Sequence, residues 1–398
     1  MFHLIQKTKA NVLVTNAANV RRSQTAATVS QSFCVILLAL TVWFVFSPVL
    51  CRAESFTFVP RSNVLIGGGP LSVTVADFDA DGNQDFAEGS PGNAVVVVYY
   101  GKGNGRFRPS VSFPANSYPY ELAAADLNAD GYPDLVVNNF NTISILLNDK
   151  AGGFGAPVIF TADGSPRGIG IGDFNGDGNL DLAIGNEAND DVSILLGNGT
   201  GNFGLPTNFP AGDQPESVAV GDFNEDGILD LAVSAYISTN VVILQGDGAG
   251  GFTYKNSYPL AGNAAEVVVG DFNNDQHLDF AVGYYNADNH IVTFLGNGLG
   301  AFTSGGAVPV GDVHGLTAAD FNLDGNLDLA GATYFGEGVM VAVGDGTGHF
   351  NAKKFSLTGR QPLPYDVAAA DFDGDGRPDL VTANYGNGTA SLLFNTLP

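Results

Sequence analysis

The chain has 398 residues, 53 of them glycine, and its 41 acidic and 16 basic residues give a formal charge of −25. A hydrophobic content of 45% and an aromatic content of 11% exclude a disordered acidic protein, and the many glycines argue against a helical fold. Nucleic acid is not an expected partner, because so acidic a protein repels its phosphates.

The first 53 residues have the composition of a targeting segment. They contain basic but no acidic residues, and residues 33–50 (FCVILLALTVWFVFSPVL) form an uncharged apolar run. Ala53 is a small residue at the position that a signal peptidase requires, which predicts cleavage before Glu54. The alternative is an uncleaved signal anchor, since the run is just long enough to span a bilayer. Either alternative predicts that the rest of the chain lies outside the cytoplasm, as a secreted, extracellular or periplasmic protein or as one anchored in the membrane.

One nonapeptide, D-x-[DN]-x-D-[GQ]-x-x-D, recurs seven times in the rest of the chain. The copies lie about 49 residues apart, the spacing of a repeat architecture. They begin at Asp77, Asp126, Asp173, Asp222, Asp271, Asp320 and Asp371. Each unit also contains four short apolar runs bounded by glycine, asparagine and aspartate, which is the pattern of β-strands. The sequence therefore predicts an all-β fold, a seven-bladed β-propeller of four-stranded antiparallel blades over residues 54–398.

The two ends of the repeat array predict how the ring closes. In six units a phenylalanine follows a glycine-rich turn and begins the fourth strand, at Phe107, Phe154, Phe203, Phe252, Phe302 and Phe350. The seventh unit lacks this strand, whereas residues 55–60 (SFTFVP) supply a matching segment at the start of the array. We therefore expect the N-terminal strand to complete the last blade, which removes the exposed sheet edges. An open solenoid, the alternative architecture, has no use for this arrangement.

The nonapeptide has the donor pattern of a calcium loop. Side-chain oxygens at positions 1, 3, 5 and 9 and a backbone carbonyl at position 7 can supply the roughly six to eight oxygen ligands of Ca²⁺. Glycine at position 6 permits the positive φ of a sharp turn. The predicted side-chain ligands are Asp77, Asp79, Asp81, Asp85, Asp126, Asn128, Asp130, Asp134, Asp173, Asn175, Asp177, Asp181, Asp222, Asn224, Asp226, Asp230, Asp271, Asn273, Asp275, Asp279, Asp320, Asn322, Asp324, Asp328, Asp371, Asp373, Asp375 and Asp379.

Up to seven structural calcium ions would compensate for two features of the sequence. More than half of the 41 acidic residues lie in the loops, where carboxylates without a cation repel one another. Both cysteines, Cys34 and Cys51, lie in the N-terminal segment, so the propeller has no disulfide. The alternative is that the Asp and Asn side chains only shape Asx turns. This alternative has most weight in the fifth loop, where Gln276 replaces glycine and would be strained at positive φ.

These residues make the chain similar to the FG-GAP/VCBS repeat family, best known from the seven-bladed propellers of integrin α chains. Residues 154–157 (FGAP) are close to the motif that names the family, and the nonapeptide resembles the family's calcium loop. The resemblance covers residues 54–398 and implies calcium loops on one face and ligand-contacting loops on the other. Because all seven units carry a loop, the chain looks more like the free-standing bacterial-type members, whose activities are diverse.

Positions that differ between the repeats predict a ligand face. The residue that begins each innermost strand changes from unit to unit, and all seven should ring the central axis at the end opposite the calcium loops. Tyr120, Arg167, Glu216, His314 and Tyr365 are the candidate ligand-binding residues of this ring. A second ring, six residues after each loop, is mostly aromatic and consists of Pro91, Phe140, Glu187, Tyr236, Tyr285, Tyr334 and Tyr385. Such side chains around a concavity suit glycans or peptides. The alternatives are tolerance of variation in the first ring and repeated packing in the second.

The sequence favours a calcium-stabilised binding or adhesion module that recognises an extracellular protein or a polysaccharide. It contains none of the H-E-x-x-H, G-x-S-x-G or C-x-x-C motifs. A competing hypothesis is a polysaccharide lyase or hydrolase that uses Arg167, Glu216, His314 and Tyr365 at the axial face, and a third is a purely structural role. We expect a monomer.

Overall fold

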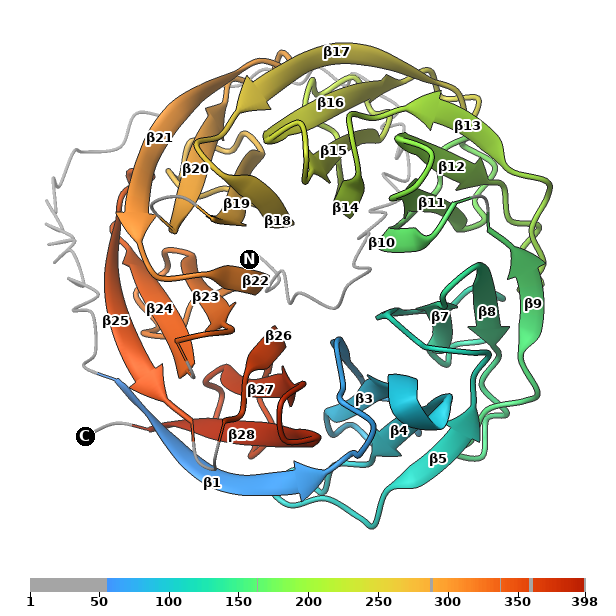
Figure 1. Ribbon diagram of the computed structural model, residues 1–398, viewed down its shortest axis with the longest axis vertical. Helices are drawn as coiled ribbons and strands as arrows, with labels where there is room; N and C mark the ends of the chain where they lie inside the picture. Colours follow the sequence, from blue (N-terminus) through green and yellow to red (C-terminus); the bar gives the residue numbers. More distant parts are fainter. Residues whose placement is uncertain (1–55, 163, 287–288, 337, 358–360, 397–398) are drawn as a thin grey trace, which may run out of the picture. The chain divides into compact units, whose positions relative to one another are not determined.

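The computed structural model describes residues 56–396 except 163, 287–288, 337 and 358–360, so the predicted signal peptide or anchor lies outside the described residues. The described strands form seven antiparallel sheets of four strands, arranged as the blades of a ring (Figure 1). The predicted seven-bladed propeller is confirmed. No helix within the described ranges is long and apolar enough to cross a membrane.

The blades follow one another in chain order, and each runs outward from its innermost strand. Blade 1 contains β2 (Val73–Ala76), β3 (Asp85–Ser90), the 3₁₀ helix η1 (Pro91–Asn93), β4 (Val95–Tyr99) and β5 (Val111–Pro114). Blade 2 contains β6 (Glu121–Ala125), β7 (Asp134–Asn138), β8 (Thr142–Leu146) and β9 (Val158–Thr161). Blade 3 contains β10 (Pro166–Gly172), β11 (Asp181–Asn186), β12 (Asp191–Leu195) and β13 (Thr207–Pro210).

The remaining blades have the same order of strands. Blade 4 contains β14 (Pro215–Gly221), β15 (Asp230–Ala235), β16 (Asn240–Gly246) and β17 (Phe252–Pro259). Blade 5 contains β18 (Asn263–Gly270), β19 (Asp279–Tyr285), β20 (His290–Gly296) and β21 (Phe302–Pro309). Blade 6 contains β22 (Val313–Ala319), β23 (Asp328–Thr333), β24 (Gly338–Gly344) and β25 (Phe350–Ser356). Blade 7 contains β26 (Pro364–Ala370), β27 (Asp379–Asn384), β28 (Thr389–Thr396) and β1 (Thr57–Leu65).

The ring closes through the N-terminal strand, as the sequence predicts. β1 pairs antiparallel with β28, from Thr57 opposite Thr396 to Leu65 opposite Thr389. Figure 1 shows the blue β1 along the outer edge of the red blade 7. The strand continues beyond the predicted Pro60, because a register shift between Pro60 and Ser62 lets the pairing resume. No edge of β28 is therefore left open on this side.

The hydrophobic core lies between the blades. Seven buried clusters, each built from two adjacent blades, account for the described core. The second strand of each blade is buried on both faces, whereas the outer strands β5, β9 and β13 are largely exposed. Because each blade face needs a neighbour, burial of the core depends on a complete ring.

At six of the seven seams, the contacts between adjacent blades, a pair of phenylalanines packs near the nonapeptide loops. The residue at position 2 of the loop packs edge-to-face against the phenylalanine that follows the glycine-rich turn of the next blade, or against Phe58 in blade 7, with ring centroids 5.4–5.9 Å apart. The expectation that this phenylalanine begins the fourth strand is confirmed in blades 4 to 6 and wrong in blades 1 to 3, where it forms an isolated bridge before that strand. The pairs are Phe372–Phe107, Phe78–Phe154, Phe174–Phe252, Phe223–Phe302, Phe272–Phe350 and Phe321–Phe58. Between blades 2 and 3, Leu127 takes the first place and Phe203 packs against its cluster. Phe58 of the N-terminal strand thus takes the place of the phenylalanine that the seventh unit lacks, at the contact between blades 6 and 7.

Replacing Phe58 with alanine should lower the free energy of unfolding by about 3–5 kcal/mol, because a large aromatic ring leaves a cavity in the closing seam. Phe58 is 5% exposed and its ring centroid lies 5.2 Å from that of Phe355 and 5.5 Å from that of Phe321. The matched control is Val59→Ala on the same strand, since Val59 is 42% exposed. Urea unfolding of the two variants makes the measurement. Equal unfolding free energies would show that β1 does not close the ring through this side chain.

Candidate calcium loops and axial face

Each nonapeptide loop turns through two residues in the left-handed region, at positions 4 and 6. In blade 1 these are Ala80 at φ 54° and Gly82 at φ 87°, and in blade 5 they are Asn274 at φ 60° and Gln276 at φ 73°. The sequence predicts the turn at position 6 from its glycines but gives no signal for position 4. The positive φ expected at Gln276 is confirmed, so the fifth loop folds like the others at the cost of backbone strain.

Backbone N–H groups hold the loop carboxylates in place. The aspartate at position 1 accepts from the N–H groups of positions 5 and 6 in all seven loops, and the aspartate at position 5 accepts from that of position 7. In loops 2 to 6 the asparagine at position 3 also accepts from position 5. These are the Asx turns of the alternative interpretation. They also fix the oxygens in one place, so they are compatible with metal binding.

The aspartate at position 9 binds two backbone N–H groups, a role that the sequence does not predict. One of its oxygens accepts from the N–H of position 2 and the other from an N–H at the end of the third strand, at 2.6–3.2 Å. In blade 1, for example, Asp85 binds the N–H groups of Phe78 and Gly101. The carboxylate therefore ties the start of the loop to the end of a strand that lies 14 to 17 residues beyond the aspartate itself. Its predicted role as a metal ligand stays a prediction.

These seven aspartates are buried carboxylates that their surroundings disfavour in the charged form. Burial raises their pKa to between about 6 and about 8, against the opposing effect of the two backbone hydrogen bonds, and neighbouring loop aspartates raise it further. The highest value, about 8, is that of Asp379, and the next, about 7, are those of Asp85 and Asp328. A cation beside them would favour the charged form and so oppose the rise in pKa.

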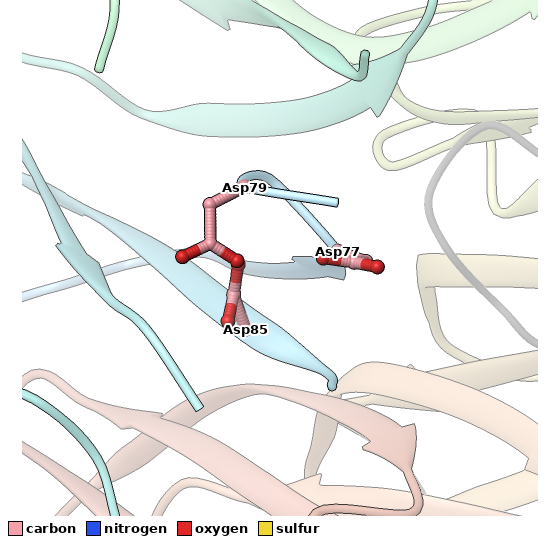
Figure 2. Close-up of side chains that lie close together, drawn as sticks. All are labelled: Asp77, Asp79 and Asp85. Atoms are coloured by element: carbon pink, nitrogen blue, oxygen red, sulfur yellow. The ribbon is translucent and has the colours of Figure 1, made fainter. Parts of the chain in front are cut away.

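The first loop shows that the donors fit a calcium ion. Oxygens of Asp77, Asp79 and Asp85 lie within 4.8 Å of one another, as do those of Asp371, Asp373 and Asp375 in the seventh loop. Figure 2 shows the three carboxylates of the first loop close together. An ion with ligands at about 2.3–2.6 Å can bridge oxygens at these separations. Asp79 Oδ1 is moreover buried and has no hydrogen-bond partner, which is the state of an oxygen that a cation would satisfy.

Sequence reasoning missed three basic side chains that contact predicted metal ligands. Arg108 lies against Asp79 and Asp81, Lys150 lies 3.3 Å from Asp130, and Arg377 lies 2.7 Å from Asp375. Only Arg377 belongs to a nonapeptide itself, so the repeat alignment carries no signal for the other two.

The axial residues predicted from the sequence do converge, at the opposite end of the innermost strands from the loops. The Tyr120 hydroxyl lies 2.6 Å from that of Tyr365 and 3.2 Å from Glu216 Oε1, across three blades that are far apart in sequence. Burial raises the pKa of Tyr120 and that of Glu216, although Arg167 opposes the shift of the carboxyl group. These contacts close the axis: the cavity that remains has about 30 Å³, room for a water molecule and not for a polymer.

Arg167 packs against the ring of Tyr120. Its guanidinium carbon lies 3.8 Å from the centroid of the Tyr120 ring, and its Nε and Nη2 contact Glu187 Oε2 at 2.7 and 2.6 Å. Although burial alone would lower the pKa of Arg167, the negative groups around it raise it overall, so the side chain is a cation. One residue of each predicted ring, Arg167 and Glu187, thus forms an ion pair.

His314 packs against tyrosines of both predicted rings of residues. It stacks on Tyr285 with centroids 4.4 Å apart and also contacts Tyr365 at 4.8 Å and Tyr334 at 5.2 Å. Burial lowers its pKa to about 4, so the imidazole is neutral at pH 7. Tyr236 extends the aromatic surface beyond Tyr285 at 5.6 Å.

Two open pockets flank the closed axis. The blade 2–3 pocket has about 470 Å³ and is lined by Ser117, Tyr118, Tyr120, Asn139, Phe140, Ser165, Pro166, Arg167 and Glu187. The blade 4–6 pocket has about 430 Å³ and is lined by Tyr236, Tyr285, Asn286, Asn289, Asp312, His314, Tyr334 and Phe335. Of the five candidate residues, Tyr120 and Arg167 line the first pocket and His314 the second, whereas Glu216 and Tyr365 face only the axial cavity. The sequence analysis missed Tyr118, Asp312 and Phe335, each of which lies within two residues of a position in the predicted rings.

Comparison with protein families matches most of the propeller. The FG-GAP-like repeat family matches residues 77–137, 126–184, 173–233, 271–331 and 320–382, and the FG-GAP repeat family matches residues 215–254. No curated protein matches the chain.

Solved structures share the fold at low sequence identity. The BBS1N chain of a complex with ARL6DN is 13% identical with a TM-score of 0.60, and the match covers 86% of this chain and 97% of that one. An Agrocybe aegerita lectin that recognises non-reducing terminal N-acetylglucosamine is 17% identical with a TM-score of 0.51, over 83% and 86% of the two chains. A protein from Lactobacillus plantarum is 12% identical with a TM-score of 0.58, over 74% and 86%. At such identities the likeness concerns the fold alone.

Replacing Gln276 with glycine should raise the free energy of unfolding by roughly 0.5–1 kcal/mol, because relief of left-handed strain exceeds the entropy that glycine costs. The reciprocal variant Gly325→Gln, in the sixth loop, should lower it by roughly 1 kcal/mol. No heavy atom lies within 4 Å of a Cβ built at Gly325, so the second change tests backbone conformation without a clash. Both values come from urea unfolding. A destabilised Gln276→Gly variant would mean that the glutamine side chain contributes more than its strain costs.

Proposed function

Because the chain belongs to the FG-GAP repeat family, we propose that it is a calcium-stabilised binding module that acts outside the cell and holds a polysaccharide on its axial face. The observation that carries the proposal is the pair of open, aromatic-lined pockets beside the closed axis. The extracellular location rests on the sequence of the first 53 residues, which lie outside the described range.

The blade 4–6 pocket has the chemistry of a saccharide site. Phe335 is 78% exposed at its rim, and its ring lies 4.9 Å from that of Tyr334. An exposed aromatic ring gains from contact with the apolar face of a sugar ring, and carboxylate and amide groups can bind hydroxyls in fixed directions. Asp312 and Asn286 supply such groups at the same pocket. Asp312 is held in place by the N–H of Phe335, 2.9 Å from its Oδ2.

The blade 2–3 pocket combines the same features with a cation. Phe140 is 62% exposed and Tyr118 is 43% exposed, and both line the pocket beside Arg167. The guanidinium keeps donors available beyond those that bind Glu187, because it has five N–H groups in all. Two pockets on one face suit a long ligand such as a polysaccharide, since two weak contacts on one chain add avidity. An extended protein segment is the alternative ligand.

The geometry favours binding over catalysis. Glu216, the candidate acid of the enzymatic hypothesis, lies in the closed axial cavity and accepts a hydrogen bond from Tyr120. His314 stacks within the aromatic cluster. A substrate would reach both of these groups only if the contacts of Tyr120 and Tyr365 at the axis separated.

Calcium in the seven loops would stabilise the fold and not act in the binding step. The loops lie at the seams, where the residue at position 2 packs against the next blade and its backbone carbonyl accepts a hydrogen bond from that blade, as from Gly250 to Phe174 at 3.0 Å. Neutralising the loop carboxylates would therefore stabilise both a blade and its contact with the neighbour.

Removing calcium with excess EDTA should lower the melting temperature markedly and reversibly. An ion that binds the native state alone at 100-fold excess over its Kd contributes about 2.7 kcal/mol per site, and several loops contribute together. Differential scanning calorimetry with added calcium, added magnesium and EDTA makes the comparison. Superimposable melting curves in calcium and EDTA would rule out a stabilising role for the ion.

Replacing Phe335 or Phe140 with alanine should weaken polysaccharide binding at least about tenfold, because exposed aromatic anchors carry a large share of binding energy. The melting temperature should hardly change, since both rings are mainly exposed. The matched control is Leu299→Ala, an apolar side chain that is 74% exposed in the glycine-rich turn of blade 5. A glycan array identifies the polymer, and calorimetric titration then compares the variants.

The same experiment separates the alternatives. Retained binding in both phenylalanine variants would move the site away from the two pockets. Binding to a protein in place of every glycan on the array would replace the polysaccharide by the alternative ligand. Release of shortened chains from the bound polymer would establish the enzymatic hypothesis.

A further inference from the structure

The first loop differs from most of the others in its charge. Position 3 is aspartate in loops 1 and 7, at Asp79 and Asp373, and asparagine in the other five. In those five loops the asparagine oxygen accepts the N–H of position 5. The additional carboxylate of loop 1 is directed toward a different partner, a guanidinium group from the glycine-rich turn of the same blade.

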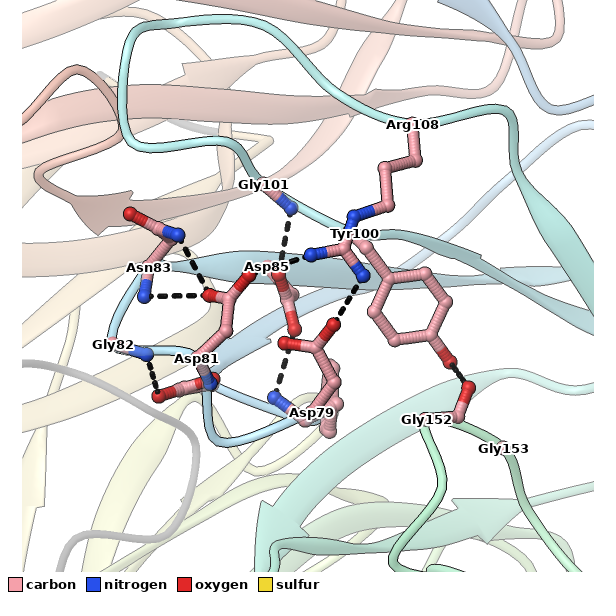
Figure 3. Close-up of polar contacts among 12 residues, drawn as sticks. Asp79, Asp81, Gly82, Asn83, Asp85, Tyr100, Gly101, Arg108, Gly152 and Gly153 are labelled. Carbon is pink, nitrogen blue, oxygen red and sulfur yellow. Dashed lines mark hydrogen bonds and ion pairs between the residues drawn. The ribbon is translucent and has the colours of Figure 1, made fainter.

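Arg108 holds two of the predicted calcium ligands at once. Its Nη1 contacts Asp79 Oδ2 and its Nη2 contacts Asp81 Oδ2 at 2.6 Å (Figure 3). The backbone N–H of Arg108 donates to the Tyr100 carbonyl at 2.8 Å, which fixes the base of the side chain. A planar guanidinium suits such a double contact better than an ammonium group would. The corresponding residues of the other six blades carry no positive charge: Gly155, Gly204, Thr253, Thr303, Asn351 and Val59.

Asp79 therefore has two different environments at its two oxygens. Oδ2 binds Arg108, whereas Oδ1 is buried and has no hydrogen-bond partner. Asp79 also belongs to the group of carboxylates formed with Asp77 and Asp85. A calcium ion bound at Oδ1 would lie one carboxylate away from the guanidinium. The positive charge of Arg108 would then repel the ion that the same aspartate binds.

We propose that Arg108 is an internal counter-cation of the first loop: it stabilises the loop without calcium and lowers the affinity of that loop for calcium. The proposal rests on the proposed calcium binding. It predicts opposite effects of Arg108 on the two states, because the guanidinium neutralises carboxylates in one and competes with a divalent cation in the other. Arg377 and Lys150 make related contacts in loops 7 and 2, which belong to the two blades beside blade 1.

The test compares Arg108→Gln with Arg106→Gln in the full chain. Arg106 is an exposed residue of the same turn, so both variants lose one positive charge in the same region. In EDTA, Arg108→Gln should melt at a lower temperature than the wild-type chain. In calcium titrations, one site should tighten roughly tenfold, so that at limiting free calcium the variant holds about one more ion per chain by equilibrium dialysis. Arg106→Gln should match the wild type in both measurements.

Other outcomes overturn the proposal. A variant that melts lower in EDTA and also loses affinity would show that Arg108 only positions Asp79 and Asp81. No change in either measurement would show that the contact has no effect. If Arg108→Gln does not fold, Arg108→Lys keeps the charge and should retain the weak site; a tightened site in that variant contradicts the proposal. Absence of calcium binding in all variants and in the wild type would instead refute the proposed calcium binding itself.

Discussion

The fold depends on a buried carboxylate, the aspartate at position 9 of each nonapeptide, which binds two backbone N–H groups that are otherwise distant. One belongs to the start of the loop and the other to the end of the third strand. The contact holds the loop in the position from which its second residue reaches the next blade. Because burial disfavours the charged form of this carboxylate, a nearby cation would stabilise it. Loop geometry, blade packing and the proposed calcium binding thus follow from one interaction.

The contacts between adjacent blades link each loop to the next blade around the ring. Each phenylalanine at position 2 packs against a phenylalanine of the following blade, and at the last seam Phe58 of the N-terminal strand takes that place against Phe321. A change in one loop therefore affects two blades. The basic side chains that contact loops 7, 1 and 2 make these loops differ from the other four, so calcium binding at seven similar sequences need not mean seven similar affinities.

The packing that stabilises the ring and the proposed ligand-binding face lie at opposite ends of the innermost strands. The loop end repeats the same residues in every blade because each seam has the same packing to satisfy. The axial end varies, and there Tyr120, Glu216 and Tyr365 close the channel while exposed aromatic side chains surround the pockets beside it. This separation would allow the residues of the proposed ligand face to change without loss of the fold.

The sequence by itself determined the number of blades, the closure by the N-terminal strand and the turn at position 6, because repeats at fixed spacing display local geometry directly. It also predicted that Tyr120, Arg167, Glu216, His314 and Tyr365 ring the axis. Tertiary structure decided which of them are enclosed and which line a pocket, since this depends on how side chains from non-adjacent blades meet. It likewise decided that Arg108 binds Asp79 and that Asp85 binds the Gly101 N–H. Such contacts join residues 16 to 29 positions apart, and only the register and twist of the strands bring them within hydrogen-bond distance.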